Sequence, residues 1–371
     1  MAVIINIMQM SIQTINVTGS SLIAKAIGEN DKNNIKAISG NCIILTSMIS
    51  AITIFIALII KPVLPTLFNV DKIGNTYLVV RLVGFLQSSI VTVLSGQQRT
   101  LGKQGNILKL RIIAVILNLV LDVIVVNYGY GIEGVAWVTV LIDSLMAIYL
   151  LIKSKKSIMY KFNQKVMKRI FELFKWNFVE RIITRIDNFI FNILVSRMGE
   201  NEYAVHIILI QIRDIVENFI QGFGDGITIS IGIASGKNDK KYMEKVKGIA
   251  KTIINISSII VPIATCIMGL IIMKISLNEA ILQNIFYQIL PILILGIYIV
   301  MSATYYYAII RGLRDFEFLA KRNFISSIIK IIVATILAYT PLGIIGVWIS
   351  YLIYCIIQKG MSKNRTKQFF G

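Results

Sequence analysis

Apolar residues occur in long blocks along this chain, and short polar segments separate them. Eleven mostly apolar runs lie near residues 2–26, 38–60, 77–97, 106–126, 132–152, 171–197, 203–234, 248–273, 282–309, 322–340 and 342–358. A helix rises about 1.5 Å per residue, so about 20 apolar residues cross roughly 30 Å of hydrocarbon. The pattern predicts eleven transmembrane helices and therefore an all-α polytopic membrane protein.

The second half of the chain repeats the first. Gly28-Glu29-Asn30-Asp31-Lys32 and Gly40 recur 208 residues later as Gly236-Lys237-Asn238-Asp239-Lys240 and Gly248. Gly131-Ile132-Glu133-Gly134-Val135 and Arg99-Thr100-Leu101 recur 212 residues later as Gly343-Ile344-Ile345-Gly346-Val347 and Arg311-Gly312-Leu313. This repetition predicts two pseudo-symmetric helical-bundle lobes. The run at 171–197 shifts to before Met1, so the first lobe is expected to lack one helix.

Basic residues are concentrated in alternate loops, although the whole chain has a net charge of +19. They are Lys32 and Lys36; Arg99, Lys103 and Lys109; Lys153, Lys155, Lys156, Lys161, Lys165, Lys168 and Arg169; Lys237, Lys240, Lys241, Lys245 and Lys247; Arg311, Arg314 and Lys321; and Lys359, Lys363, Arg365 and Lys367. Cytoplasmic loops have such an excess, so the C-terminus is predicted to be cytoplasmic and the charge needs no nucleic-acid partner. The alternation also implies one further helix before the first run.

These boundaries predict three parts. Residues 1–152 form an N-lobe of five helices, 153–170 a basic cytoplasmic linker, and 171–371 a C-lobe of six helices with a basic tail. No basic residue precedes Lys25, so Met1–Ile23 lacks the basic region of a cleavable signal peptide.

Composition argues against an enzyme and against a cofactor. Hydrophobic residues make up 56% of the chain, above the roughly 45–50% of soluble domains. His206 is the only histidine, which excludes a His-based triad or metal cluster, and Cys42, Cys266 and Cys355 lack metal or redox spacing. We expect His206 to form a hydrogen bond at a helix end, and Pro262 and Pro291 to kink their helices. With no phosphate-binding glycine loop, any pumping must use an ion gradient.

Two repeat-related helices have polar stripes. One contains Asn6, Gln9, Gln13 and Asn16; the other contains Gln211, Asp214, Asn218, Gln221 and Asp225, with Glu217 beside them. A shift of 208 residues superimposes the stripes. Polar groups inside a bilayer usually face a cavity or one another. The stripes therefore predict a substrate cleft between the halves, or else two helix-to-helix hydrogen-bond seams.

The run at 171–197 is the most charged, with Glu180, Arg181, Arg185 and Asp187. Glu180 and Arg181 are expected near the cytoplasmic end, where long side chains snorkel to water, whereas Arg185 and Asp187 lie deeper. Arg185 is assigned to the cleft, and Glu180 and Asp187 to cation coupling. Structural ion pairing and an interfacial position are the alternatives.

Asn118 and Asp122 stand four residues apart in the run at 106–126 and share a helix face. A buried carboxylate beside an amide suits a proton or sodium site, because a cation can replace the proton. The alternative is that Asp122 caps the helix end before Asn127. Asp143 and Lys330 also lie within apolar runs.

Several ordered motifs resemble the multidrug and toxic compound extrusion (MATE) family. They are Thr18 to Asp31; Leu94-Ser95-Gly96 through Arg99-Thr100-Leu101-Gly102; Asn118-Leu119-Val120-Leu121-Asp122; Gly131 to Trp137; and Tyr203-Ala204-Val205-His206 with Gly222-Phe223-Gly224-Asp225-Gly226. The resemblance implies a V-shaped pair of lobes in a bacterial cell membrane, alternating access, and exchange of H⁺ or Na⁺ for a small organic, often cationic, substrate.

Several family positions differ here. Asn118 and Asp122 match the family's N-lobe cation site, whose helix 4 asparagine corresponds to Ser95. The acid on the family's helix 1 has no counterpart. Glu180 is the candidate for a helix 7 coupling glutamate, although alignment places that position nearer Thr184 or Arg185. No acid lies between Ala280 and Ile310.

Our leading hypothesis is a MATE-like efflux antiporter in which cation loading of Asp122 releases a drug held between the polar stripes. One alternative is a lipid-linked oligosaccharide flippase of the same superfamily, which would have a more cationic cleft, as Arg181 and Arg185 permit. A truncated, non-transporting remnant is the other.

Overall fold

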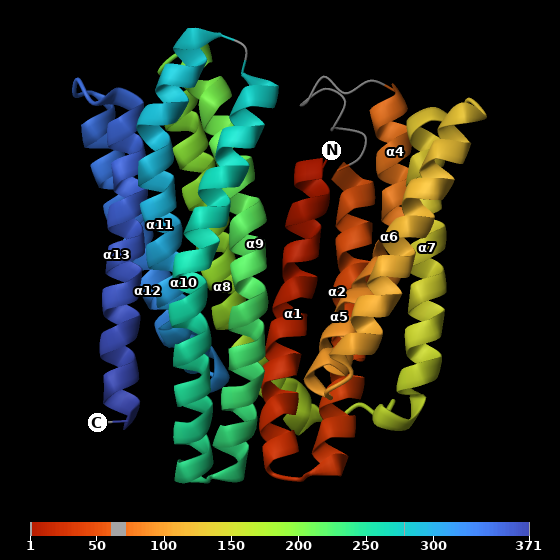
Figure 1. Ribbon diagram of the computed structural model, residues 1–371. Helices are drawn as coiled ribbons and strands as arrows, with labels where there is room; N and C mark the ends of the chain where they lie inside the picture. Colours follow the sequence, from red (N-terminus) through yellow and green to blue (C-terminus); the bar gives the residue numbers. More distant parts are fainter. Residues whose placement is uncertain (1, 61–71, 278, 371) are drawn as a thin grey trace. The chain divides into compact units, whose positions relative to one another are not determined.

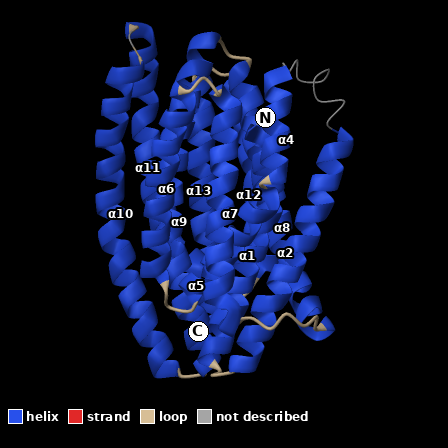
Figure 2. Cartoon of the chain, turned by 90° about the vertical axis from the view of Figure 1, so that its right-hand side faces the viewer, coloured by secondary structure: helices blue, strands red, loops and turns tan. Residues whose placement is uncertain are grey.

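The computed structural model describes residues 2–60, 72–277 and 279–370, and throughout these ranges the regular secondary structure is helical (Figures 1 and 2). The helices are α1 (Ala2–Gly28), α2 (Lys32–Ile60), α4 (Lys72–Val83), α5 (Phe85–Thr100), α6 (Gln104–Asn127), α7 (Gly131–Ser154), the 3₁₀ turn η2 (Lys155–Ser157), α8 (Gln164–Ser196), α9 (Glu200–Lys237), α10 (Lys240–Ser276), α11 (Ala280–Gly312), α12 (Phe316–Ala338) and α13 (Gly343–Phe370).

The predicted apolar runs all lie on helices. The run at 77–97 is shared by α4 and α5, which meet at Gly84. By length and composition, six of the described helices can span a membrane, namely α2, α6, α7, α10, α11 and α13. Pro262 and Pro291 lie inside α10 and α11. The all-α polytopic fold is confirmed.

The chain divides into two compact units, Met1–Phe178 and Val179–Gly371, and the division falls inside α8. In unit 1, α1 packs against α2 and α5, while α7 packs against α4, α5 and α6. In unit 2, α11 packs against α9, α10 and α13, and α13 also packs against α12. Each unit has its own apolar core, around Ile15 and Cys42 in the first and around Phe286 and Trp348 in the second.

The hairpins at the repeated motif have the same local geometry in both units. Asn30 (φ 56°) and Asn238 (φ 54°) end α1 and α9 in the left-handed conformation, which asparagine tolerates better than most residues. The following aspartates begin the next helix: Asp31 accepts a hydrogen bond from the Asn34 N–H (2.9 Å), and Asp239 accepts one from the Tyr242 N–H (3.1 Å). The repeat found in the sequence is therefore a structural repeat.

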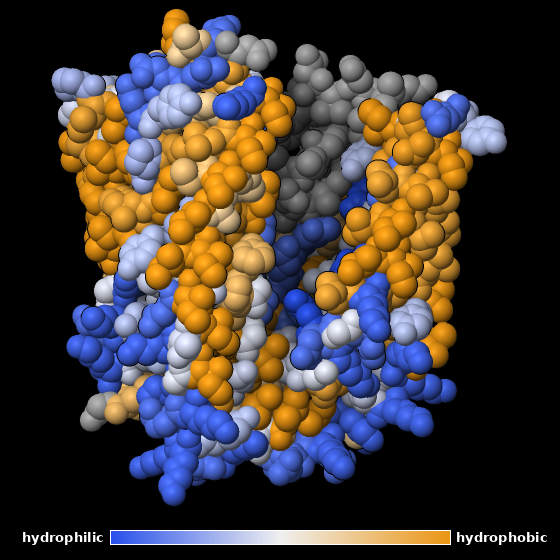
Figure 3. Space-filling view, viewed as in Figure 1, coloured by the Kyte–Doolittle hydropathy of each residue, from blue (hydrophilic) through white to orange (hydrophobic). Residues whose placement is uncertain are grey.

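Lateral faces of the helices expose large apolar side chains, as expected for contact with lipid. On α6, Val115 is 67% exposed, and on α10 Ile259 is 63% exposed. Figure 3 shows hydrophobic residues along the sides of the helices and hydrophilic ones at their lower ends. This distribution matches an apolar layer bounded by water.

Candidate functional site

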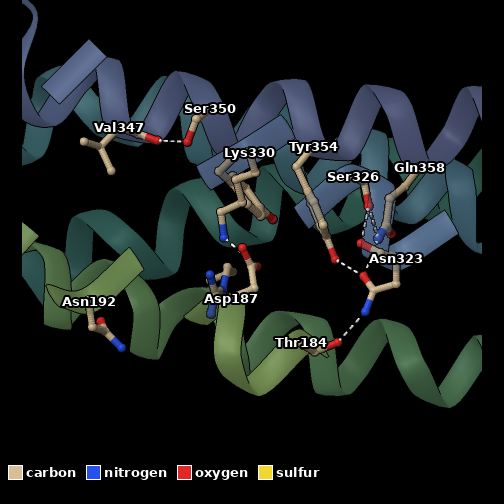
Figure 4. Close-up of polar contacts among 12 residues, drawn as sticks. Thr184, Asp187, Asn192, Asn323, Ser326, Lys330, Val347, Ser350, Tyr354 and Gln358 are labelled. Carbon is tan, nitrogen blue, oxygen red and sulfur yellow. Dashed lines mark hydrogen bonds and ion pairs between the residues drawn. The ribbon is translucent and has the colours of Figure 1, made fainter. Parts of the chain in front are cut away.

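A buried ion pair joins α8 to α12 in unit 2. Lys330 Nζ lies 2.9 Å from Asp187 Oδ2, and the two residues are only 1% and 3% exposed (Figure 4). The ammonium also lies over the rings of Phe191 (4.1 Å to the centroid) and Tyr354 (5.4 Å). Asp187 Oδ1 is buried and has no hydrogen-bond partner. The pair is thus shielded from water, with one carboxylate oxygen left unsatisfied.

Asn323 on α12 connects three helices beside this pair (Figure 4). Its Nδ2 donates to the Glu180 carbonyl and to Thr184 Oγ1, both at 2.9 Å. Its Oδ1 accepts from the Tyr354 hydroxyl and from Gln358 Nε2, also at 2.9 Å. The amide therefore uses both its donor and its acceptor groups within the bundle.

Arginines surround Tyr307 next to Glu180, whose carbonyl accepts a hydrogen bond from Asn323. Arg322 lies 3.5 Å from the Glu180 carboxylate and places its guanidinium 5.0 Å from the Tyr307 ring centroid. Arg311 lies 5.6 Å from that centroid and binds Asp225 at 3.1 Å. Glu180 is only 8% exposed, so the expectation that it snorkels to water is wrong: it is buried because a cation on α12 neutralises it.

The polar stripe on α9 is divided between exposed and bonded residues. Gln211, Asp214, Asn218 and Gln221 are exposed, as is Arg185 on α8. Glu217 instead accepts a hydrogen bond from the Tyr351 hydroxyl (3.1 Å), and Asp225 pairs with Arg311. Arg213, 5% exposed, lies beneath the stripe and binds Asp214 at 2.9 Å. Within unit 2, most of the stripe is accessible rather than sealed in a helix seam.

The stripe on α1 is partly buried within unit 1. Gln9, Gln13 and Asn16 are half-buried, and the side chain of Asn6 lies outside the described residues. Asn16 packs so closely on Gly96 of α5 that a Cβ there would overlap its Oδ1. Asn16 is therefore fixed against the α5 backbone, which only glycine allows at this distance.

Asn118 and Asp122 lie together on α6, both half-buried. Asp122 Oδ1 is buried and has no hydrogen-bond partner. The end of α6 is capped by backbone groups, since the Tyr128 N–H donates to the Ile124 carbonyl (3.0 Å). The alternative that Asp122 caps this helix end is therefore wrong.

A second ionisable cluster in unit 1 was not predicted as a site. Asp143 on α7 accepts a hydrogen bond from Ser88 on α5 and lies within electrostatic range of Arg81 and Arg111. The charges lie on α4, α6 and α7, so the sequence did not show that they meet.

The structure divides the four predicted coupling residues between the units. Asn118 and Asp122 belong to unit 1, and Glu180 and Asp187 to unit 2. Arg322 and Asn323 were not predicted as site residues, and Lys330 was predicted only as an intramembrane charge. Their signal was a set of polar residues inside the apolar run at 322–340.

His206 and two of the cysteines are buried in the protein interior. His206 Nε2 lies 3.0 Å from Asn192 Oδ1, which confirms its predicted hydrogen bond. Cys42 and Cys355 are buried and unpaired. In the described part of the chain, no three His, Cys, Asp or Glu side chains are grouped as a metal site would require.

Comparison with known proteins agrees with this architecture. Residues 4–277 match the model of a family described as "Polysaccharide biosynthesis protein". A curated relative, "Probable multidrug resistance protein NorM" of Agrobacterium fabrum, is 24% identical over 190 residues, which cover 47% of this chain and 41% of the relative.

Solved structures superimpose on almost the whole chain. A MATE in complex with MaD3S gives a TM-score of 0.86 at 20% identity, covering 99% of this chain and 86% of that one. A MOP superfamily transporter from Pyrococcus furiosus, described as having a binding pocket of reverse polarity that suggests a different function, gives 0.87 at 19% identity, covering 97% and 85%.

Fold and site together define a multi-pass helical membrane protein with the fold of MATE transporters, which confirms the resemblance seen in the sequence. By the family model, the chain belongs to the polysaccharide biosynthesis protein family.

Proposed function

We propose that this chain is a secondary active transporter of the MATE type, which exchanges a small organic substrate for a proton or sodium ion. The observation that supports coupling most directly is the Asp187–Lys330 pair, because two ionisable groups are buried inside an apolar bundle. Intramembrane charges are costly and commonly mark ion or proton pathways.

Protonation of this pair changes its energy. Addition of a proton to Asp187 removes the anion that neutralises Lys330 and leaves a buried cation unpaired, which is strongly unfavourable. The bundle then favours an arrangement in which Lys330 meets water or another anion. A ligand that binds two arrangements unequally shifts the population between them. The proton acts as such a ligand here.

Asn118 and Asp122 form the second proposed cation site, in unit 1. The unpartnered Asp122 Oδ1 offers an oxygen to a proton or sodium ion. The proposed transporter therefore has one candidate ion site in each unit.

The proposed substrate-binding groups are the exposed polar residues on α9 in unit 2 and, separately, the half-buried amides of α1 in unit 1. Asp214 has a side chain 55% exposed and pairs with Arg213 at 2.9 Å, so it offers a substrate a polar group whose charge is already partly neutralised.

A lipid-linked oligosaccharide flippase is the second candidate. The family description names polysaccharide biosynthesis, and Arg181, Arg311 and Arg322 all act electrostatically on Tyr307. The carboxylates of Glu180 and Asp225 act electrostatically on Arg181. A cluster of guanidinium groups suits an anionic head group, and the relative with a pocket of reverse polarity shows the same fold.

The test uses proteoliposomes with an imposed proton or sodium gradient. We expect the wild-type chain to accumulate ethidium, a small organic cation, in response to one gradient. Asp187→Asn should abolish the dependence of accumulation on the gradient but leave ethidium binding unchanged. Asp122→Asn should reduce the dependence on the gradient. Glu317→Gln, which changes an exposed carboxylate on α12, is the control and should behave as wild type.

Gradient-driven accumulation by both asparagine variants would contradict the coupling sites. If the chain moved no organic cation but translocated a fluorescent polyprenyl-diphosphate glycolipid between leaflets, the flippase would replace the antiporter.

A further inference from the structure

The segment from the end of α7 to the start of α8 has an unusual charge composition. Between residues 153 and 169 lie seven basic residues and no acidic one: Lys153, Lys155, Lys156, Lys161, Lys165, Lys168 and Arg169. All seven are exposed. Membrane topology accounts for basic residues here, but it does not require the particular structure in which they are held.

This basic linker (residues 153–170) is fixed to the first turns of α2. The Met159 N–H donates to the Lys36 carbonyl (3.0 Å), and Asn41 Nδ2 donates to the Lys161 carbonyl (3.3 Å). Asn41 Oδ1 accepts from the Asn163 N–H (3.0 Å). Asn41 is fully buried, so two linker positions are bonded to one core side chain.

Glycine allows this close approach. At Gly40, an added Cβ would overlap the carbonyl oxygen of Met159. The linker backbone therefore lies directly against α2, and its outward side chains are presented from a fixed surface.

Those outward side chains include aromatic residues. Tyr160 and Phe162 are 58% and 57% exposed, whereas Ile158 is turned inward at 7%. Lys161 lies between the two aromatic residues and is also exposed. Aromatic rings beside lysines at the end of a membrane helix are typical of the membrane–water interface.

We propose that the basic linker binds the surface of a leaflet that contains anionic phospholipids. It follows α7, whose candidate span includes the η2 turn (Gly131–Ser157), so the chain enters the linker at the level of the lipid head groups. Each lysine or arginine near an anionic leaflet contributes roughly 1 kcal/mol. Insertion of Tyr160 and Phe162 adds apolar burial to this attraction.

A second basic segment shows the difference between this linker and ordinary topological charge. Around the α9–α10 turn, Lys247 is bound to Glu244 (2.7 Å), and Lys237 lies over the ring of Tyr242 (3.9 Å). Asp239 adds another acid there. These cations are partly neutralised by their own segment, whereas the basic linker contains no acid.

The test measures amide hydrogen exchange of the full chain in nanodiscs of phosphatidylcholine, with and without phosphatidylglycerol. We expect residues 155–163 to exchange several-fold more slowly when phosphatidylglycerol is present, and sodium chloride to weaken the effect. The triple variant Lys155→Gln, Lys156→Gln, Lys161→Gln should lose the difference. Tyr160→Ser with Phe162→Ser should reduce it.

The matched control is Lys240→Gln, Lys241→Gln, Lys245→Gln, which removes the same charge from the α9–α10 segment and should keep the difference. Equal exchange of wild type in both lipids would overturn the proposal. If the control variant also lost the slower exchange in phosphatidylglycerol, the effect would come from the net charge of the chain and not from the basic linker. Slowing by inorganic phosphate in phosphatidylcholine discs would show a free-anion site instead of a lipid surface.

Discussion

Helices α6 and α12 hold the same place in the internal repeat but differ in chemistry. The shift of 212 residues places Lys330 at the position of Asn118, and Ala334 at that of Asp122. Lys330 is buried and paired with Asp187, whereas Asn118 and Asp122 are half-buried. The hairpins at Asn30 and Asn238 kept the same local geometry after duplication, whereas the ionisable groups of α6 and α12 differ, so we expect the two lobes to have different roles in any ion-coupled cycle.

Removal of one partner from the buried pair should have the largest effect. Lys330→Met leaves Asp187 buried without its cation, and breaking such a pair costs about 3–5 kcal/mol. Thermal unfolding in detergent should show a large fall in midpoint temperature. Asn118→Met at the matching position of α6 should cost far less.

The double variant Asp187→Leu, Lys330→Met should regain much of the lost stability, because no uncompensated charge remains. Equal effects of Lys330→Met and Asn118→Met would contradict the proposed asymmetry.

The first helical turns of α7 and α13, which contain Gly134 and Gly346, should respond alike to alanine substitution. A Cβ added at Gly134 would overlap Val125 and would lie 2.7 Å from Tyr130. A Cβ added at Gly346 would lie 2.7 Å from Leu337 and 3.2 Å from Leu342. These neighbours are themselves 212 residues apart. Alanine at either glycine should destabilise by about 1–3 kcal/mol through overpacking, measured by thermal unfolding.

Gly222→Ala on α9 is the control for these substitutions, because nothing lies within 4 Å of its Cβ position. It should stabilise by about 0.5–1 kcal/mol, since alanine favours a helix over glycine. Destabilisation at only one of the two turns would show that the repeat has lost its equivalence there.

The helix caps should give a smaller, matched effect. Asp31→Ala and Asp239→Ala each remove the side-chain acceptor at the start of a helix, at a cost of about 1 kcal/mol. Serine at either position should restore most of the stability. An effect confined to one unit in chemical or thermal unfolding would argue against equivalent hairpins.

Exposed ion pairs should matter least. Lys321–Glu317 on α12 (2.7 Å) and Lys25–Glu29 at the end of α1 (3.4 Å) are both i,i+4 pairs with partly exposed side chains. Replacing either lysine by glutamine should cost about 0.5 kcal/mol or less, and high salt should remove the difference. A cost near that of Lys330→Met would contradict the distinction between buried and exposed pairs.

The fold was largely predictable because periodicity, loop charge and repetition are local or one-dimensional signals. Apolar runs marked the helices, and the Asn30 and Asn238 motifs marked equivalent hairpins. The break at Gly84 was not predicted, since an apolar run continues through it.

The site was less predictable because its partners come from distant helices. Asp187 was identified from its own run, but its pairing with Lys330 required the packing of α8 on α12. Glu180 was expected to reach water, yet Arg322 compensates its burial. The grouping of Arg81 and Asp143 likewise depends on tertiary contacts, which no spacing within a single helix reveals.

The bonding of the basic linker to Asn41 has a practical consequence for protein engineering. Exposed loops usually accept inserted tags or protease sites, but tolerance depends on how the backbone is bonded. An insertion between Ile158 and Asn163 would break the bonds made at Met159, Lys161 and Asn163. Fusion partners should be placed elsewhere, because this stretch is exposed but does not tolerate a change in length.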